Sequence, residues 1–95
     1  MPHKTITIYE FHDFIKRIKK LLKPEELEEL REYIAARPEI GDVIPGTGGL
    51  RKMRWEAGGK SKRGGARVIY YYHFTDSAIL LLTAYIKSEQ GDLTS

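Results

Sequence analysis

The chain has 95 residues, of which 41% are hydrophobic and 31% are charged, and its formal net charge is +3. This balance predicts one globular domain with a single core, and it excludes disordered and collagen-like chains. The absence of cysteine excludes disulfide frameworks, thiol nucleophiles and cysteine-based zinc sites. No long apolar run or secretory signal pattern is present, so we expect a soluble, cytoplasmic protein that does not enter a membrane.

The first half of the chain predicts a strand followed by two helices. Residues Thr5 to Tyr9 alternate in the manner of a short strand. Apolar residues then recur at helical spacing from Phe11 to Leu22, with basic residues between them. Pro24 suits the first turn of a second, acidic helix, which Pro38 ends. Because the link between the helices is short, we expect an antiparallel helix hairpin that packs on one face of a sheet.

The second half predicts an all-β arrangement. The Gly- and Pro-rich segment from Ile40 to Gly49 indicates an ordered loop. The last predicted strand is almost entirely apolar, so we expect it to be central and covered on both faces. The predicted strands are Leu50 to Glu56, Ala66 to Phe74 and Ala78 to Ile86, and a basic turn, Ala57 to Gly65, joins the first two.

The segment from Gly48 to Tyr72 concentrates the positive charge of the chain. It holds seven Lys or Arg residues and one acid, a local charge of +6 against +3 for the whole chain. Basic residues interleaved with aromatic rings suit a phosphate-bearing partner whose bases can stack, so RNA is the first candidate. The RNA-contacting candidates are Arg51, Lys60, Lys62, Arg63 and Tyr71.

Three cations from this segment are candidates for chemistry. Side chains alternate along a strand, so Lys52 and Arg54 should share the face opposite Met53 and Trp55, which are the natural core pair. If register places Arg67 beside them, three positive groups surround a space the size of a phosphate. They could stabilise charge on a phosphodiester under attack by the 2′-hydroxyl of RNA. A lysine crowded by like charges has a lowered pKa and can act as a base.

Less specific readings are more common for these residue types. A basic hairpin is more often a solvated or nucleic-acid-binding face than a catalytic site. Three consecutive tyrosines are more often sheet packing than a base platform. No histidine has a second ligand at metal spacing, and the glycines match no nucleotide-binding loop, so we expect no metal and no cofactor.

Three blocks of the sequence together resemble a known family. The runs GDVIPGTGGLRKMRW, GKSKRGGARVIYYY and LLLTAYIKSEQGDLT, which extend over roughly Gly41 to Thr94, resemble the RelE/ParE superfamily of toxins, and within it the HigB-like branch. The resemblance implies a single α+β domain over residues 1–95, with two N-terminal helices packed on a curved, mainly antiparallel sheet.

The resemblance also implies an activity. Toxins of this kind are mRNA interferases that enter the ribosomal A site and cleave mRNA without metal, leaving a 2′,3′-cyclic phosphate. A cognate antitoxin neutralises them, often one with a helix-turn-helix, and operator DNA is bound through the antitoxin. By analogy, Lys52 is the base, Arg67 stabilises the transition state and Arg54 assists the leaving group.

Two positions depart from the pattern of some relatives. Their arginine after the last strand is replaced by Lys87 and Ser88, so Lys87 is the substitute candidate, and Tyr85 is the candidate for their substrate tyrosine. The C-terminal helix of those relatives is missing from this sequence. Two alternatives remain open: a ParE-like toxin that inhibits DNA gyrase by protein contact, and a non-catalytic module that binds RNA or the ribosome.

Overall fold

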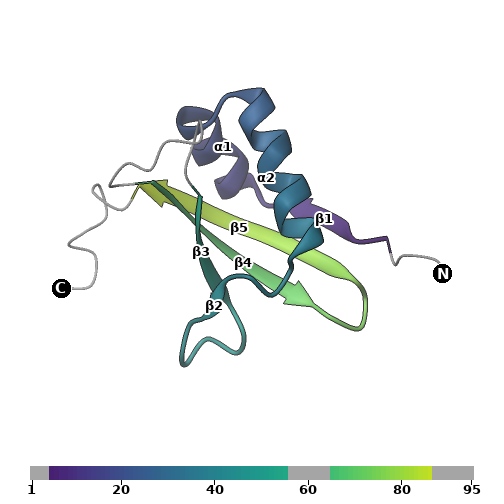
Figure 1. The fold of residues 1–95 in the computed structure, drawn as a ribbon. Helices are drawn as coiled ribbons and strands as arrows, with labels where there is room; N and C mark the ends of the chain where they lie inside the picture. The colour runs from purple at the N-terminus through teal and green to yellow at the C-terminus, as the bar shows by residue number, and fades with distance from the viewer. Residues whose placement is uncertain (1–4, 56–64, 87–95) are drawn as a thin grey trace.

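The chain folds into a five-stranded sheet with two helices packed against it (Figure 1). The computed structural model describes residues 5–55 and 65–86. None of the helices within these ranges is long and apolar enough to cross a membrane. The elements are β1 (Thr7–Glu10), α1 (His12–Leu21), α2 (Pro24–Ala36), β2 (Asp42–Val43), β3 (Arg51–Trp55), β4 (Ala66–His73) and β5 (Ala78–Ile86).

The sheet is mixed, with strand order β1-β5-β4-β3-β2. The strands from β2 to β5 pair antiparallel with their neighbours, whereas β1 pairs parallel with β5. Because parallel neighbours need a crossover connection, the helices and the remaining strands all lie between β1 and β5 in sequence. The predicted α+β class, with a mainly antiparallel sheet, is confirmed.

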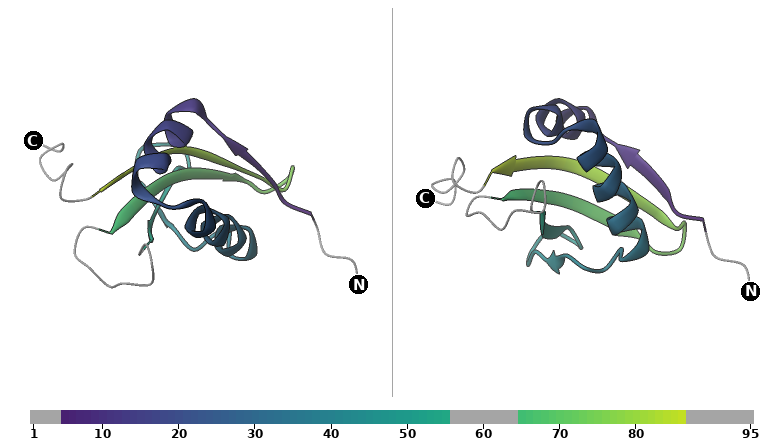
Figure 2. Two further views of the ribbon diagram at one scale, coloured as in Figure 1. Left: turned by 90° about the horizontal axis from the view of Figure 1, so that it is seen from above. Right: turned by 45° about the horizontal axis from the view of Figure 1, so that its top comes forward.

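Both helices cover the same face of the sheet (Figure 2). The amphipathic pattern of α1 buries Phe14 and Ile18, and that of α2 buries Leu30 and Ile34, as the sequence predicts. These side chains pack on the strand residues whose alternation points them to the same face. On the sheet side the core consists of Met53, Val68, Tyr70, Ile79, Leu81 and Ala84.

The expected antiparallel helix hairpin is wrong. In both views of Figure 2 one helix is seen along its axis while the other is seen from the side, so the two helices cross at a wide angle. The reason lies in the link, since Leu22 and Lys23 both have extended backbone angles and turn the chain sharply. Pro24 is at the start of α2, as predicted, and the Lys23 backbone N–H donates to Glu26 Oε1 at 2.8 Å.

The strands differ from the sequence prediction in three respects. β1 begins two residues later than predicted. The segment predicted as a loop before β3 contains the short strand β2. β5 lies inside the sheet between β1 and β4, but the prediction that both its faces are covered is wrong. Its Leu80 borders a hollow on the face away from the helices, which we call the open face.

A bulge in β5 changes which side chains reach each face. Tyr70 pairs with Leu81, but the preceding residue of β4, Ile69, pairs with Thr83, so Leu82 has no partner in β4. A bulge of this kind shifts the alternation of the strand by one residue. Both Leu81 and Ala84 can therefore face the helices although they are three residues apart, and both are fully buried.

Helix α1 also contacts β5 beyond the end of β1. The pairing of β1 with β5 ends at Leu81, and α1 begins two residues after β1. In this region the Thr83 hydroxyl donates to Asp13 Oδ2, and Arg17 Nε donates to the same oxygen at 3.0 Å. The Thr83 bond, followed by the Arg17 charge, lowers the pKa of the Asp13 carboxyl.

We expect Thr83→Val to raise the pKa of Asp13 toward its ordinary value, measured by NMR titration of the carboxyl carbon. Because the pKa is lowered in the folded state, the ionised carboxyl stabilises the fold above the unfolded pKa, and this is lost as the pH falls through the folded pKa. The variant should therefore lose less stability than the wild type on acidification. An unchanged pKa in Thr83→Val would assign the shift to Arg17 instead.

Candidate RNA-cleaving site

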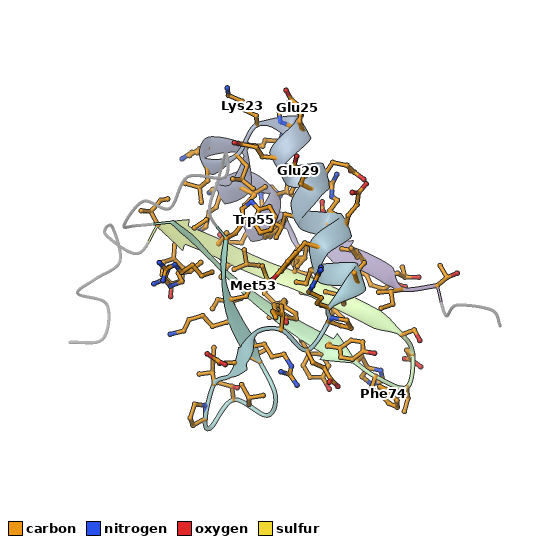
Figure 3. All side chains as sticks on the ribbon, in the orientation of Figure 1. Lys23, Glu25, Glu29, Met53, Trp55 and Phe74 are labelled. Atoms are coloured by element: carbon orange, nitrogen blue, oxygen red, sulfur yellow. The ribbon has the colours of Figure 1, made fainter. Side chains whose placement is uncertain are left out.

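Strand β3 separates the core residues from the candidate catalytic residues. Met53 is buried and Trp55 packs against the core, with its ring 5.4 Å from that of Tyr33 on α2 (Figure 3). Alternation then places Lys52 and Arg54 on the open face, where both are exposed. The predicted division of this strand into a core face and a cationic face is confirmed.

The register of β3 and β4 brings the third cation to the same place. Arg54 and Arg67 are directly opposite partners, and Lys52 is opposite Ile69. Opposite residues share a face, with Cβ atoms about 4.5 to 5.5 Å apart, and diagonal neighbours such as Lys52 and Arg67 are about 7 to 8 Å apart. We call Lys52, Arg54 and Arg67 the cationic row. Long side chains from these positions can reach one phosphate.

The cationic row borders a hollow that also includes an acid. The hollow has a volume of about 370 Å³, and Asp42 of β2 lies in its wall together with all three cations. Asp42 is the register partner of Lys52 across β2 and β3. Lys52 therefore has a carboxylate on one side and an arginine-bearing strand on the other, which sequence reasoning missed because β2 has only two residues.

Arg67 takes part in none of the ion pairs found among the described residues. Its Nη1 donates to the Gly65 carbonyl at 3.3 Å, and the side chain is half-buried. A guanidinium has five N–H donors in a fixed fork, so this one long bond leaves donors for a bidentate contact with phosphate oxygens.

The bulge in β5 brings Tyr85 to the cationic row. Tyr85 pairs with Arg67, so the two residues share the open face. Without the extra residue Leu82, alternation from the buried Leu81 would direct Tyr85 toward the helices. Tyr85 also borders a smaller hollow with Arg17 and Lys20, two of the basic residues that the sequence shows on α1.

The remaining predicted contact residues lie in different places. Arg51 lies on the helix side of β3, where its Nη1 donates to the Gly41 carbonyl at 2.7 Å and to the Glu39 carbonyl at 3.2 Å. These bonds tie it to the loop before β3, so its position suits bracing the loop better than the predicted contact with RNA. Lys60, Lys62, Arg63 and Lys87 lie outside the described residues.

Tyr71 lies on the open face, farther along β4 from Arg67. Its ring packs beside Gly49, where an added Cβ would lie 3.1 Å from Tyr71 Cε1. Gly49 also has a φ of 121°, a conformation that side chains disfavour. Tyr71 borders a second, larger hollow of about 710 Å³, to which Tyr9, Phe11, His73 and Leu80 also contribute. Sequence reasoning missed this hollow because it depends on the parallel pairing of β1 with β5.

Comparison with known structures identifies the fold. No protein-family model matches the chain. A chain of the intact RelBE toxin–antitoxin complex of E. coli is similar to it, with a TM-score of 0.65 and 15% identity over 86% of this chain and 96% of that one. The isolated E. coli RelE toxin also has a TM-score of 0.65, with 14% identity over 96% of this chain and all of that one.

An archaeal structure has the higher sequence identity. The RelE–RelB complex from Pyrococcus horikoshii matches with a TM-score of 0.58 and 26% identity over 88% of this chain and 97% of that one. The chain therefore has the fold of RelE toxins, as its sequence resemblance predicts. Its assignment to the HigB-like branch stays a prediction.

Proposed function

We propose that this chain is the toxin of a toxin–antitoxin pair and that it cleaves mRNA in the ribosomal A site. The observation that supports this function best is the cationic row, which gathers Lys52, Arg54 and Arg67 on one open face of a RelE-like sheet. Similar chains are solved in complex with the RelB antitoxin, so a cognate antitoxin is the expected protein partner, with mRNA and the ribosome as the other partners in the cytoplasm.

The proposed reaction uses a nucleophile that RNA itself carries. The 2′-oxygen attacks the neighbouring phosphorus, the new 2′-O–P bond forms and the P–O5′ bond breaks. The products are a 2′,3′-cyclic phosphate and a 5′-hydroxyl. One proton leaves the 2′-hydroxyl and one reaches the departing 5′-oxygen, so the reaction consumes no water and its nucleophile does not require a metal ion.

Each residue of the cationic row has a separate role in the proposed reaction. Lys52 accepts the proton of the 2′-hydroxyl as the neutral amine, and the ammonium group that results lies next to the carboxylate of Asp42, its register partner. Arg67 binds the non-bridging oxygens, whose charge grows in the transition state, through its planar fork. Arg54 lies opposite Arg67 and stabilises the leaving oxygen, while Tyr85 is the register partner of Arg67 on β5.

Mapping of mRNA ends after induction of the protein tests this function. We expect new 5′-hydroxyl ends within translated reading frames, and we expect them to disappear when an inhibitor blocks translation initiation. Ends that form equally without ribosomes would reject the A-site step but retain the nuclease. Growth arrest with intact mRNA and with inhibited DNA supercoiling would favour the gyrase-inhibiting alternative.

A further inference from the structure

The larger hollow on the open face has aromatic side chains in its walls and aliphatic side chains between them. Two rows of residues cross the strands β1, β5 and β4 in register: Tyr9, Leu80 and Tyr71 form one, and Thr7, Ala78 and His73 form the other. Phe11 borders the same hollow just beyond the end of β1. Tyr9 and Phe11 are 54% and 46% exposed, so their rings are accessible.

The spacing between two walls of the hollow suits a flat ring. Neighbouring strands are about 4.8 Å apart, so Tyr9 and Tyr71, which lie on either side of Leu80, are separated by about 10 Å at the backbone. A planar ring between two aromatic walls needs about 3.5 to 4 Å of carbon–carbon separation on each side. The residues between the walls, Leu80 and Ala78, leave the space above β5 open because neither carries a ring.

The hollow continues the cationic row on the same sheet face. The open-face residues of β4 are Arg67, Ile69, Tyr71 and His73, in that order. Tyr71 follows Arg67 by four positions along the extended strand, a distance of about 13 Å. A short single strand held by its phosphate at Arg67 can therefore reach the hollow with a neighbouring nucleotide.

The charge of the hollow favours an uncharged occupant. Asp76 lies in its wall, with Oδ2 3.3 Å from His73 Nδ1, and no Lys or Arg borders it within the described residues. An acid beside an apolar slot repels a phosphate and also an acidic peptide. A nucleobase has no charge, and its two faces stack on aromatic side chains.

We propose that this hollow is a nucleobase-binding subsite that holds one unpaired base of the RNA whose phosphate is gripped by the cationic row. The inference rests on the proposed function, because it needs RNA on the open face. The rings of Tyr9, Phe11 and Tyr71 stack on the base, and the subsite fixes the position of the strand relative to Arg67.

Phe11→Ser is the informative variant because it removes a ring without weakening the fold. Phe11 is the N-cap residue of α1, with extended angles and no side-chain cap. Serine is a preferred N-cap residue, so the substitution stabilises the start of the helix. The matched control is Ile40→Ser, which removes an equally exposed apolar side chain, also 46%, from the helix side of the sheet near the end of α2.

The probe is a fluorescent single-stranded oligoribonucleotide with 2′-O-methyl groups, which the protein cannot cleave, and a matched series in which one base at a time is removed. Fluorescence anisotropy measures the affinity of the full chain for each. With the wild type, loss of one particular base should weaken binding between about fivefold and about 150-fold. Phe11→Ser should bind the intact oligonucleotide several-fold more weakly and lose most of this sensitivity, whereas Ile40→Ser should match the wild type.

Two results would overturn the proposal, and Arg67→Ala separates its failure from that of the proposed function. Suppose that Phe11→Ser keeps wild-type affinity and base sensitivity while Arg67→Ala loses affinity for every oligonucleotide. The proposed nucleobase subsite is then wrong, and the proposed binding of RNA phosphate by the cationic row is supported. If Phe11→Ser instead loses only neutralisation by the antitoxin, the hollow is a protein-docking surface. If Arg67→Ala binds every oligonucleotide with wild-type affinity, the phosphate is not held at Arg67, and the proposed role of the cationic row fails.

Discussion

Replacement of Arg67 by alanine should abolish growth inhibition by this protein while leaving its fold intact. Loss of a positioned donor to a developing oxyanion reduces the rate of a reaction by about 10² to 10³. Among the described residues, Arg67 makes one long hydrogen bond, from its Nη1 to the Gly65 carbonyl at 3.3 Å, so its removal should change the free energy of unfolding very little. The measurements are colony formation under induction, and the melting temperature of the purified variant.

Two further variants make the result specific. Arg67→Lys keeps the charge but loses the planar fork, so we expect an intermediate phenotype if bidentate phosphate binding matters. Arg37→Ala removes the same charge from the helix side, where the guanidinium lies over the Tyr33 ring at 4.5 Å, and it should remain toxic. Full toxicity of Arg67→Ala would reject the nuclease and leave inhibition of gyrase by protein contact as the better explanation.

The cationic row could be predicted from the sequence because it depends on local rules. Alternation along β3 assigns Met53 to the core and Lys52 and Arg54 to the other face, whatever the rest of the fold. Antiparallel pairing of β3 with β4 then places Arg67 beside Lys52 and Arg54. The apolar stripes of both helices followed from spacing in the same way, and their residues are buried.

The features that were missed all depend on pairing between distant parts of the chain. Nothing in the run from Ala78 to Ile86 marks Leu82 as a bulge, yet this residue decides that Tyr85 shares a face with Arg67. The parallel pairing of β1 brings Tyr9 beside Leu80 and creates the aromatic hollow. Asp42 reaches Lys52 through a strand too short to show a pattern.

The loop before β3 depends on one buried phenol, and this leads to the second large expected effect. Tyr70 is fully buried in the core, its hydroxyl accepts the Gly41 N–H at 2.9 Å, and it donates to the Pro38 carbonyl at 2.8 Å. An added Cβ at Gly41 would lie 2.9 Å from Tyr70 Cε1, so the loop and the ring fit closely. The phenol thus fixes the segment that joins α2 to the edge of the sheet carrying Asp42.

We expect Tyr70→Phe to reduce the free energy of unfolding by about 2 to 4 kcal/mol, measured by urea denaturation, because it leaves a buried donor and an acceptor unpaired. Such a loss is a large part of the free energy of unfolding of a typical domain, which is about 5 to 15 kcal/mol. Tyr72→Phe, which removes a hydroxyl from a half-buried ring on the same strand, is the control and should cost less.

The pH dependence of this difference identifies the hydroxyl as its cause. Burial raises the pKa of the Tyr70 phenol, so the protonated form stabilises the fold below the unfolded pKa of about 10, and this contribution is lost as the pH rises toward the folded pKa. The gap in stability between the wild type and Tyr70→Phe should therefore narrow above about pH 10. A gap that stays constant there would assign the loss to repacking of the ring.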